Sequence, residues 1–189
     1  MKEVEILVEV KNKSLNELKE ILSKYKYLGQ KQVVDEYYYD SLRKDLMPDD
    51  TGRLMKCLRI RTKGEKTLLT YKDDIFSGDT WIYSDEFETE VEDKHILEHI
   101  LQSLGLKHLV TVNNTKDIYK TDIYEIVIED VEDLGLFIEV ECKNNIEDDA
   151  VESARIEIRK FISNLGIEVS GELNAGKPEL ILRKKGRIG

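Results

Sequence analysis

Arginine and lysine recur in a regular spacing along the chain. Arg59 and Arg61 are separated by one residue, and Lys72 and Lys116 each follow a polar residue two positions earlier. Alternate residues of a β-strand point to the same face, so each pair would project together from one strand. Guanidinium and ammonium groups bind phosphate oxygens. These four cations predict a site for a phosphorylated ligand.

Carboxylates show the same spacing. Glu3 and Glu5 stand near the start of the sequence, and Glu139 and Glu141 stand far along it. Clustered carboxylates repel one another unless a hard divalent cation neutralises them. Mg²⁺ or Mn²⁺ that bridges carboxylates to phosphate is the usual arrangement for phosphoryl chemistry. If the charged faces converge, the sequence predicts a cationic zone beside a carboxylate zone, with Glu88 or Glu129 added to the latter.

The charged residues alternate with apolar ones, which predicts strands. Val4, Ile6, Val8 and Val10 form an apolar face opposite the first glutamates, and the period of two indicates a strand. Such a charged face would be solvated in an open sheet and would line the interior of a closed barrel. Periodicity alone leaves both arrangements open.

Strands of this kind are predicted over 3–11, 33–39, 54–62, 67–72, 81–92, 109–119, 123–131 and 136–142. Helices are predicted from the cap Ser14 to Gly29, from the cap Asp93 to Gly105, and over 148–165. Hairpins dominate this order, so the fold class is α+β with an antiparallel sheet.

Composition narrows the function classes. The 189 residues carry 29 Lys and Arg against 39 Asp and Glu, a formal net charge of −10. This fits one domain, and we expect it over 1–182 with a basic tail over 183–189. An acidic chain is a poor general binder of nucleic acid. No apolar run approaches the ~18 residues of a membrane span. Two cysteines and an acidic N-terminus predict a cytoplasmic protein.

Taken together, the motifs and their order resemble the CYTH superfamily, the triphosphate tunnel metalloenzymes, and within it the class IV adenylate cyclase-like branch. The resemblance covers residues 3 to about 182. Its landmarks are Glu-Val-Glu at 3–5, Asp-Glu-Tyr-Tyr-Tyr-Asp at 35–40, Leu-Arg-Ile-Arg at 58–61, Leu-Thr-Tyr-Lys at 69–72, Glu-Phe-Glu at 86–88, Lys-Asp-Ile-Tyr at 116–119 and the run at 131–141.

The resemblance implies a closed eight-stranded antiparallel barrel, a tunnel with flanking helices, that binds a nucleoside triphosphate or another polyphosphate with Mg²⁺ or Mn²⁺. It also implies that a homodimer is possible. Known activities of the family are ATP cyclisation to cyclic AMP and hydrolysis of thiamine triphosphate or tripolyphosphate. The implied metal ligands are Glu3, Glu5, Glu139 and Glu141. The implied triphosphate ligands are Arg59, Arg61, Lys72 and Lys116, which with Glu3 and Glu5 make up the catalytic set. The implied acidic wall is Glu88 and Glu129.

The chain departs from the family pattern chiefly among the cations. The family has Glu-x-Glu-x-Lys in its first strand, whereas Leu7 stands at the lysine position here; an alternative register would use Lys11. Asn114 stands where the sixth strand of the family has a lysine, and the segment 177–180 lacks the usual Ser-Tyr. Two hypotheses follow: a metal-dependent enzyme acting on a triphosphate, or a catalytically weakened module that binds a nucleotide or polyphosphate.

Four further features have a structural explanation. His95 and His99 have metal-ligand spacing on a predicted helix, but no third ligand is near, so we expect surface histidines. Cys57 is expected to be a small buried residue rather than a reactive thiol. Packing is favoured over base stacking for Trp81 and for the tyrosines at 37–39.

Overall fold

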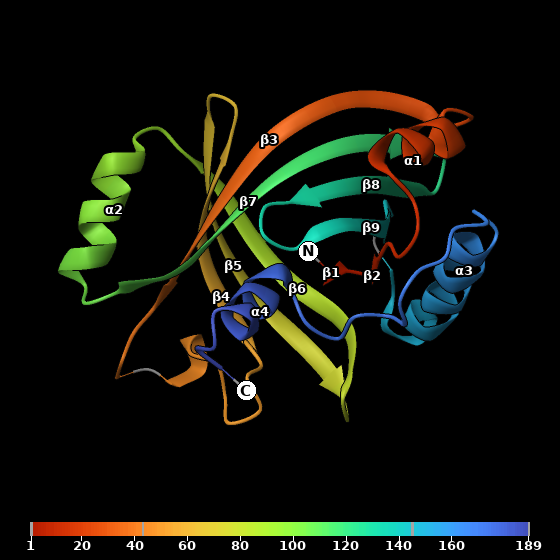
Figure 1. The fold of residues 1–189 in the computed structure, drawn as a ribbon. Coiled ribbons are helices and arrows are strands. Elements are labelled where there is room, and N and C mark those ends of the chain that lie inside the picture. The colour runs from red at the N-terminus through yellow and green to blue at the C-terminus, as the bar shows by residue number, and fades with distance from the viewer. Residues whose placement is uncertain (1, 43, 145, 189) are drawn as a thin grey trace.

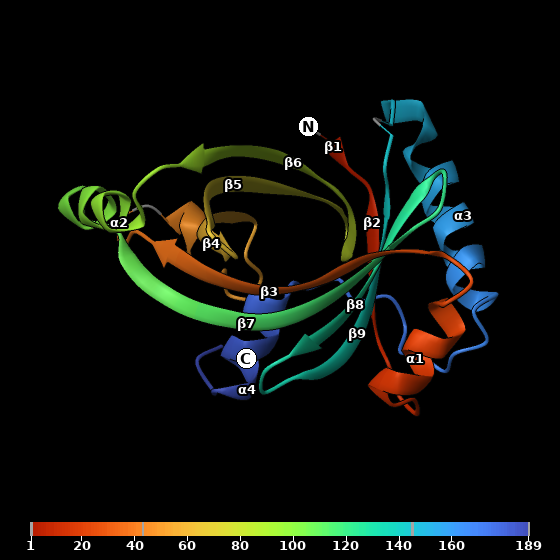
Figure 2. The ribbon, with the colours of Figure 1, turned by 90° about the horizontal axis from the view of Figure 1, so that it is seen from above.

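The molecule is built around one strongly curled antiparallel sheet (Figures 1 and 2). The computed structural model describes residues 2–42, 44–144 and 146–188. The strands are β1 (Lys2–Glu3), β2 (Glu5–Glu9), β3 (Lys26–Tyr39), β4 (Lys56–Lys63), β5 (Lys66–Ser77), β6 (Thr80–Val91), β7 (Lys107–Lys120), β8 (Tyr124–Val131) and β9 (Gly135–Cys142). Their order in the sheet is β1-β6-β5-β4-β3-β7-β8-β9-β2.

The helices lie around this sheet. They are α1 (Leu15–Leu22), α2 (Lys94–Ser103), α3 (Val151–Ser163) and α4 (Lys177–Lys184), with short 3₁₀ turns at Lys44–Leu46 and Asp148–Ala150. The helices α1 and α3 stand together at one side of the molecule, and α2 stands at the opposite side (Figures 1 and 2). The predicted α+β class is therefore confirmed.

The predicted alternation of the first strand is confirmed. Val4, Ile6 and Val8 are buried in a core cluster that includes Leu18 of α1 and Ile158 of α3. The apolar faces of β8 and β9 belong to the same cluster. Helices α1 and α3 thus cover the apolar face of this part of the sheet, and the charged face is left on the inside of the curl.

The sheet is not the closed barrel that the resemblance implied. The N-terminal strand is interrupted at Val4, so β1 pairs with β6 and β2 pairs with β9. However, β1 meets β6 only at Ser84 and Asp85, whereas β6 runs over twelve residues. Within the described part of the chain, the rest of that side of β6 has no strand beside it. The sheet is consequently a strongly curled half-barrel, open along β6.

The first helix and the C-terminal segment differ from the sequence prediction. Gly29 does not end the first helix, because α1 ends at Leu22 and the chain enters β3 at Lys26. Gly29 instead has φ of 116° and sits at a register shift between β3 and β7, where a positive φ favours glycine. Helix α4 was not predicted, and it begins with Pro178 in its first turn.

The start of α1 confirms the predicted capping box. The Ser14 Oγ accepts a hydrogen bond from the backbone N–H of Glu17 at 3.4 Å, and the Glu17 carboxylate accepts one from the Ser14 N–H at 2.9 Å. We expect Ser14→Ala to lower the free energy of unfolding by about 1 kcal/mol. Urea denaturation measures this, with Ser41→Ala, on an exposed bend, as the control. Equal midpoints for the two variants would contradict the expectation.

Within the described residues, no helix is long and apolar enough to cross a membrane. The division into a domain over 1–182 and a tail over 183–189 stays a prediction, and α4 runs across that boundary.

Candidate functional site

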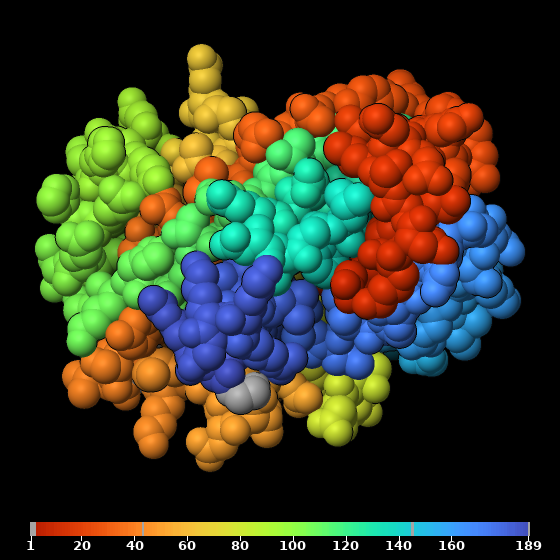
Figure 3. Space-filling view, in the orientation of Figure 1, coloured from red at the N-terminus to blue at the C-terminus, as the bar shows by residue number. Residues whose placement is uncertain are grey.

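A cavity of about 150 Å³ lies inside the curl of the sheet, and its lining is highly charged. Nine carboxylates and six cationic side chains line it, a formal excess of three negative charges. The lining carboxylates are Glu3, Glu5, Asp35, Asp74, Glu86, Glu125, Glu139, Glu141 and Glu179. The lining cations are Arg59, Arg61, Lys63, Lys72, Lys116 and Lys177. The C-terminal segment that carries α4 (dark blue) covers the middle of the face seen in Figure 3.

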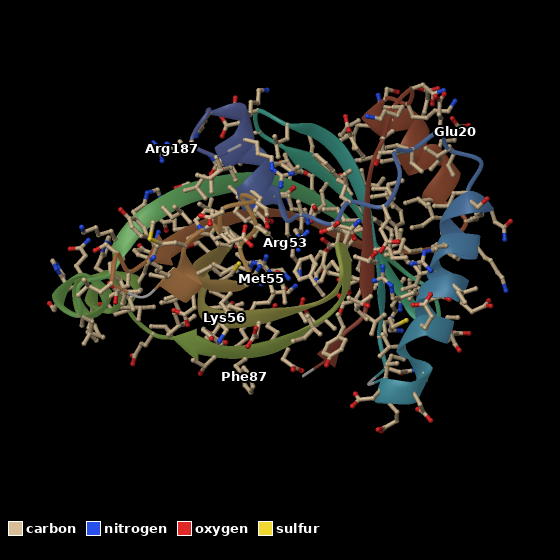
Figure 4. All side chains as sticks on the ribbon, turned by 90° about the horizontal axis from the view of Figure 1, so that it is seen from below. Glu20, Arg53, Met55, Lys56, Phe87 and Arg187 are labelled. Carbon is tan, nitrogen blue, oxygen red and sulfur yellow. The ribbon has the colours of Figure 1, made fainter. Side chains whose placement is uncertain are left out.

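Strand alternation brings these groups inward. On β6, Glu86 lines the cavity, whereas its neighbour Phe87 is 65% exposed and points away from the curl (Figure 4). On β4, Arg59 and Arg61 line the cavity with Cys57, while Ile60 between them is buried on the opposite face. The period-two pattern therefore placed Arg59, Arg61 and Glu86 on the charged faces of their strands, and these side chains line the cavity.

The structure brings all four predicted cations together, each held by carboxylates. Arg61 forms a two-pronged pair with Asp35, at 2.7 and 2.8 Å. Arg59 is held more loosely, with its guanidinium 3.4 Å from the Glu86 carboxylate. Because the Arg61 fork is satisfied by Asp35, Arg59 has more capacity left for a ligand.

The two lysines are neutralised in the same way. The Lys72 ammonium lies 3.1 Å from Glu3 and 3.2 Å from Glu5. The Lys116 ammonium lies 2.5 Å from Glu129. Lys72 thus pairs with two predicted metal ligands, and Lys116 pairs with a residue of the predicted acidic wall.

The four predicted metal ligands also line one region of the cavity. Glu5 lies directly opposite Glu141 across β2 and β9, and Glu139 lies one pleat further along β9. Burial raises the pKa of Glu141 to about 9, and the neighbouring charges of Glu5, Glu3 and Glu139 act in the same direction. Burial likewise raises the pKa of Glu5. Because burial and three neighbouring carboxylates disfavour a further negative charge, Glu141 holds a proton at neutral pH.

Glu139 behaves in the opposite way. Although burial opposes the shift, Lys177 and Lys116 hold the pKa of Glu139 well below its usual range. It is consequently ionised at any physiological pH, with two lysines on its oxygens.

The four carboxylates form a donor set that suits a divalent cation. Among the described residues, no group of three or more acidic, histidine or cysteine side chains is already gathered as a metal site, because lysines hold Glu3, Glu5 and Glu139. The chemistry nevertheless fits, since all four ligands are carboxylates, which hard cations prefer. A cation bound there would displace the proton of Glu141 and balance the charges of the neighbouring carboxylates.

The two residues predicted as an acidic wall do not reach the cavity surface. Glu88 is exposed and accepts a hydrogen bond from Thr70 at 2.9 Å. Glu129 is fully buried behind the cavity, where it pairs with Lys116 and Lys177. We infer that Glu129 orients two cations.

Two cavity residues carry buried polar atoms without a hydrogen-bond partner. They are the Nε of Arg59 and the Oδ1 of Asn114. A buried polar group left unpaired is costly, and such groups in a cavity indicate where a ligand completes the hydrogen bonding. A phosphate oxygen would satisfy Arg59.

Sequence reasoning missed Lys177 and Glu179, both on α4. The missed signal was the Lys-Pro-Glu at 177–179, because proline in the first helical turn followed by glutamate marks a helix start. Lys63 and Asp74 were also missed, although both lie on the inward faces of predicted strands or their ends.

The remaining sequence predictions are resolved as follows. His95 and His99 are exposed on α2, as expected. Trp81 is 9% exposed, and its indole N–H donates a hydrogen bond to the Ser84 Oγ at 3.1 Å. The Lys72 ammonium lies over the indole ring, 5.2 Å from the ring centre. Burial raises the pKa of the Cys57 thiol well above its usual value, so it stays protonated and unreactive.

Glu179 gives a testable pH dependence. It is 3% exposed and accepts from the Leu54 N–H at 2.8 Å, and burial raises its pKa to about 7. The folded state therefore holds a proton that the unfolded state releases near pH 4.5, so stability falls as pH rises from about 4.5 to about 7. We expect the unfolding free energy of the native chain, relative to Glu179→Gln, to drop by about 3 kcal/mol across that window. Urea denaturation in EDTA measures it, and parallel pH profiles would contradict it.

Comparison with known proteins places the chain among relatives of the same length. A family model described as the CYTH domain matches residues 1–172. The chain is 31% identical over 167 residues to "Putative adenylate cyclase MJ0240" of Methanocaldococcus jannaschii, with 86% of this chain and 90% of the relative covered. It is also similar to the solved structure of the PH1819 protein of Pyrococcus horikoshii OT3, at 28% identity and a TM-score of 0.81, covering 96% and 99% of the two chains.

A Hippeastrum protein described as "Putative adenylyl cyclase HpAC1", with "a dominant triphophatase activity", shares the fold. It is 18% identical, with a TM-score of 0.62, and the match covers 100% of this chain and 98% of that one.

Proposed function

The chain belongs to the CYTH domain family, and from this premise we propose that it is an enzyme that binds a triphosphate-containing substrate in the cavity and cleaves it. One observation carries the proposal. Six cationic side chains converge on one cavity, and the Nε of a buried arginine among them has no partner. Phosphate oxygens are the ligand that such an arrangement accepts.

We assign the triphosphate to Arg59, Arg61, Lys72 and Lys116. Arg59 binds through its unpaired Nε, while Arg61 is kept in place by its fork to Asp35. Lys72 lies between the acidic zone and Arg59, with its ammonium also 3.8 Å from Glu86. It is therefore placed to contact the substrate beside the carboxylates.

We assign a divalent cation, Mg²⁺ or Mn²⁺, to Glu3, Glu5, Glu139 and Glu141. When bound, such a cation neutralises the carboxylates and polarises a phosphoryl oxygen of the substrate. The donor set supports this assignment, because all four side chains are carboxylates, and a cation among them would offset their repulsion of a polyanion.

The bond cleaved lies within the triphosphate, and the nucleophile sets the product. Attack by the ribose 3′-hydroxyl of ATP gives cyclic AMP and pyrophosphate, as the name of the Methanocaldococcus relative suggests. Attack by water gives phosphate, as in the activity ascribed to the Hippeastrum protein. The cations and carboxylates of the cavity serve either reaction, because both cleave a phosphoanhydride bond beside the same charged groups.

The second candidate is a module that binds a polyphosphate without cleaving it. Leu7 and Asn114, two cavity residues where the family pattern has lysines, favour it. Each missing contact to a charged group removes roughly 1.5–3 kcal/mol of binding.

Incubation with ATP, thiamine triphosphate and tripolyphosphate, each with Mg²⁺, Mn²⁺ or EDTA, separates the candidates. Product analysis for cyclic AMP, pyrophosphate and phosphate is combined with calorimetric titration. We expect multiple turnovers on at least one substrate, abolished by EDTA. Metal-dependent binding with no product would establish the binding module. Neither binding nor product would overturn both candidates.

We further propose that the chain forms a homodimer and that it is cytoplasmic. Sedimentation of the purified chain tests the first, and cell fractionation tests the second.

A further inference from the structure

The first residue of α4 points its charge into the cavity. The Lys177 ammonium lies 2.5 Å from the Glu129 carboxylate and also pairs with Glu139. Its side chain is only 15% exposed. Glu129 and Glu139 come from β8 and β9, so this lysine connects a remote segment of the chain to the acidic zone of the sheet.

Helix α4 is anchored so that Lys177 stays at this place. The Glu179 carboxylate accepts hydrogen bonds from the backbone N–H groups of Leu54 and Gly176. Ile181 and Leu182 pack in a buried cluster with Leu7 of β2. Glu179, Ile181 and Leu182 are all buried, so the start of α4 is fixed against the inner face of the sheet.

The residue of the first strand that packs against α4 is Leu7. It faces the cavity directly opposite Glu139 in the β2–β9 register, where the family pattern places a lysine. A leucine there cannot bind phosphate, but it makes the apolar surface on which α4 sits. The same helix then brings an ammonium to Glu139, the residue that a lysine at position 7 would face.

We propose that Lys177 is a phosphate-binding residue that α4 supplies in place of a lysine on the first strand. Without a divalent cation, Glu129 and Glu139 hold its ammonium. A divalent cation on Glu139 would free the ammonium to bind the triphosphate. This inference rests on the proposed function.

The physical reason is competition for the same carboxylate oxygens. A buried ammonium is costly unless it is paired, and a cation on Glu139 removes one of its two partners. The flexible four-carbon stem of lysine allows the ammonium to reach a new anion nearby. Divalent cation and triphosphate would therefore strengthen each other's binding, and this coupling is reciprocal.

Calorimetric titration of the full chain with tripolyphosphate, with Mn²⁺ and with EDTA, tests the proposal. The variants are Lys177→Met, Lys177→Arg and, as a matched control, Lys184→Met. Lys184 is on the same helix, outside the cavity lining, and contacts the Asp133 carbonyl. We expect Lys177→Met to weaken tripolyphosphate binding in Mn²⁺ about 10- to 100-fold, while Mn²⁺ alone binds at least as tightly as before. Lys177→Arg should retain most of the affinity, and Lys184→Met all of it.

Moving the charge back to the strand gives a second test. In Lys177→Met, adding Leu7→Lys should restore tripolyphosphate binding, because residue 7 faces Glu139. Adding Asn114→Lys instead serves if Leu7→Lys loosens α4, and circular dichroism verifies folding. Wild-type affinity in Lys177→Met, or equal loss in Lys184→Met, would overturn the role of Lys177 alone. Failure of the native chain to bind tripolyphosphate would overturn the proposed function and this inference with it.

Discussion

Replacing Arg59 by methionine is expected to weaken triphosphate binding about 100-fold or more and to reduce kcat/KM by at least as much. The guanidinium is 8% exposed and central in the cavity, its Nε has no partner, and its contact with Glu86 is long at 3.4 Å. Two charge-assisted contacts to phosphate at roughly 1.5–3 kcal/mol each account for a loss of this size. Methionine keeps the unbranched stem of the side chain, so the fold should tolerate the change.

Titration with tripolyphosphate in Mn²⁺ and steady-state kinetics measure the effect. Arg53→Met is the matched control, because Arg53 pairs with Asp79 and lies outside the cavity lining. Its position on the segment before β4 is labelled in Figure 4. Arg59→Lys should recover only part of the binding, since an ammonium lacks the planar fork. An Arg59→Met affinity within threefold of the native value would contradict the assignment.

Replacing Glu139 by glutamine is expected to lower the affinity for Mn²⁺ about 100-fold and to leave little metal-dependent turnover. Among the four proposed ligands, Glu139 is the one whose pKa the lysines hold low, so it is fully charged and offers the strongest attraction to a cation. Glutamine has nearly the same shape but no charge. The substitution removes one negatively charged ligand, so it should weaken metal binding more than it disturbs the packing.

Mn²⁺ titration without substrate and the dependence of turnover on Mn²⁺ concentration measure this loss. Glu88→Gln is the control, because Glu88 is exposed, lies outside the cavity lining and accepts a hydrogen bond from Thr70. Thermal unfolding in EDTA shows whether the variant keeps its stability, which we expect because Lys177 and Lys116 still pair with Glu129. Unchanged Mn²⁺ affinity in Glu139→Gln would remove it from the ligand set.

The sequence was most informative for features that depend on one strand or one helix terminus alone. Alternation alone placed Glu3, Glu5, Arg59, Arg61 and Glu139 on the charged faces of their strands, because the side-chain period of a strand does not depend on its neighbours. It correctly separated these residues from the core positions between them. The capping box at Ser14 was predictable for the same reason, since its partner is three residues away.

The features that were not predicted depend on contacts between distant segments. The pairing of Lys177 with Glu139 joins α4 to β9, and no local pattern encodes it. The position of Glu129 behind two lysines follows from packing, although its strand and face were assigned correctly. The open edge of β6 follows from the length of β1, which the pattern over 3–11 did not limit to two residues.

The interrupted first strand also bears on how the chain folds. In the sheet register, Glu5 stands opposite Glu141, 136 positions away (141 minus 5). Glu3 stands opposite Ser84, 81 positions away (84 minus 3). Joining such distant segments carries a large loop-closure entropy, and topologies rich in these contacts fold slowly. The hairpins β4–β5 and β8–β9 close locally and can form early. We therefore expect the acidic half of the cavity, which needs these distant pairings, to form after the arginines of β4 are in place.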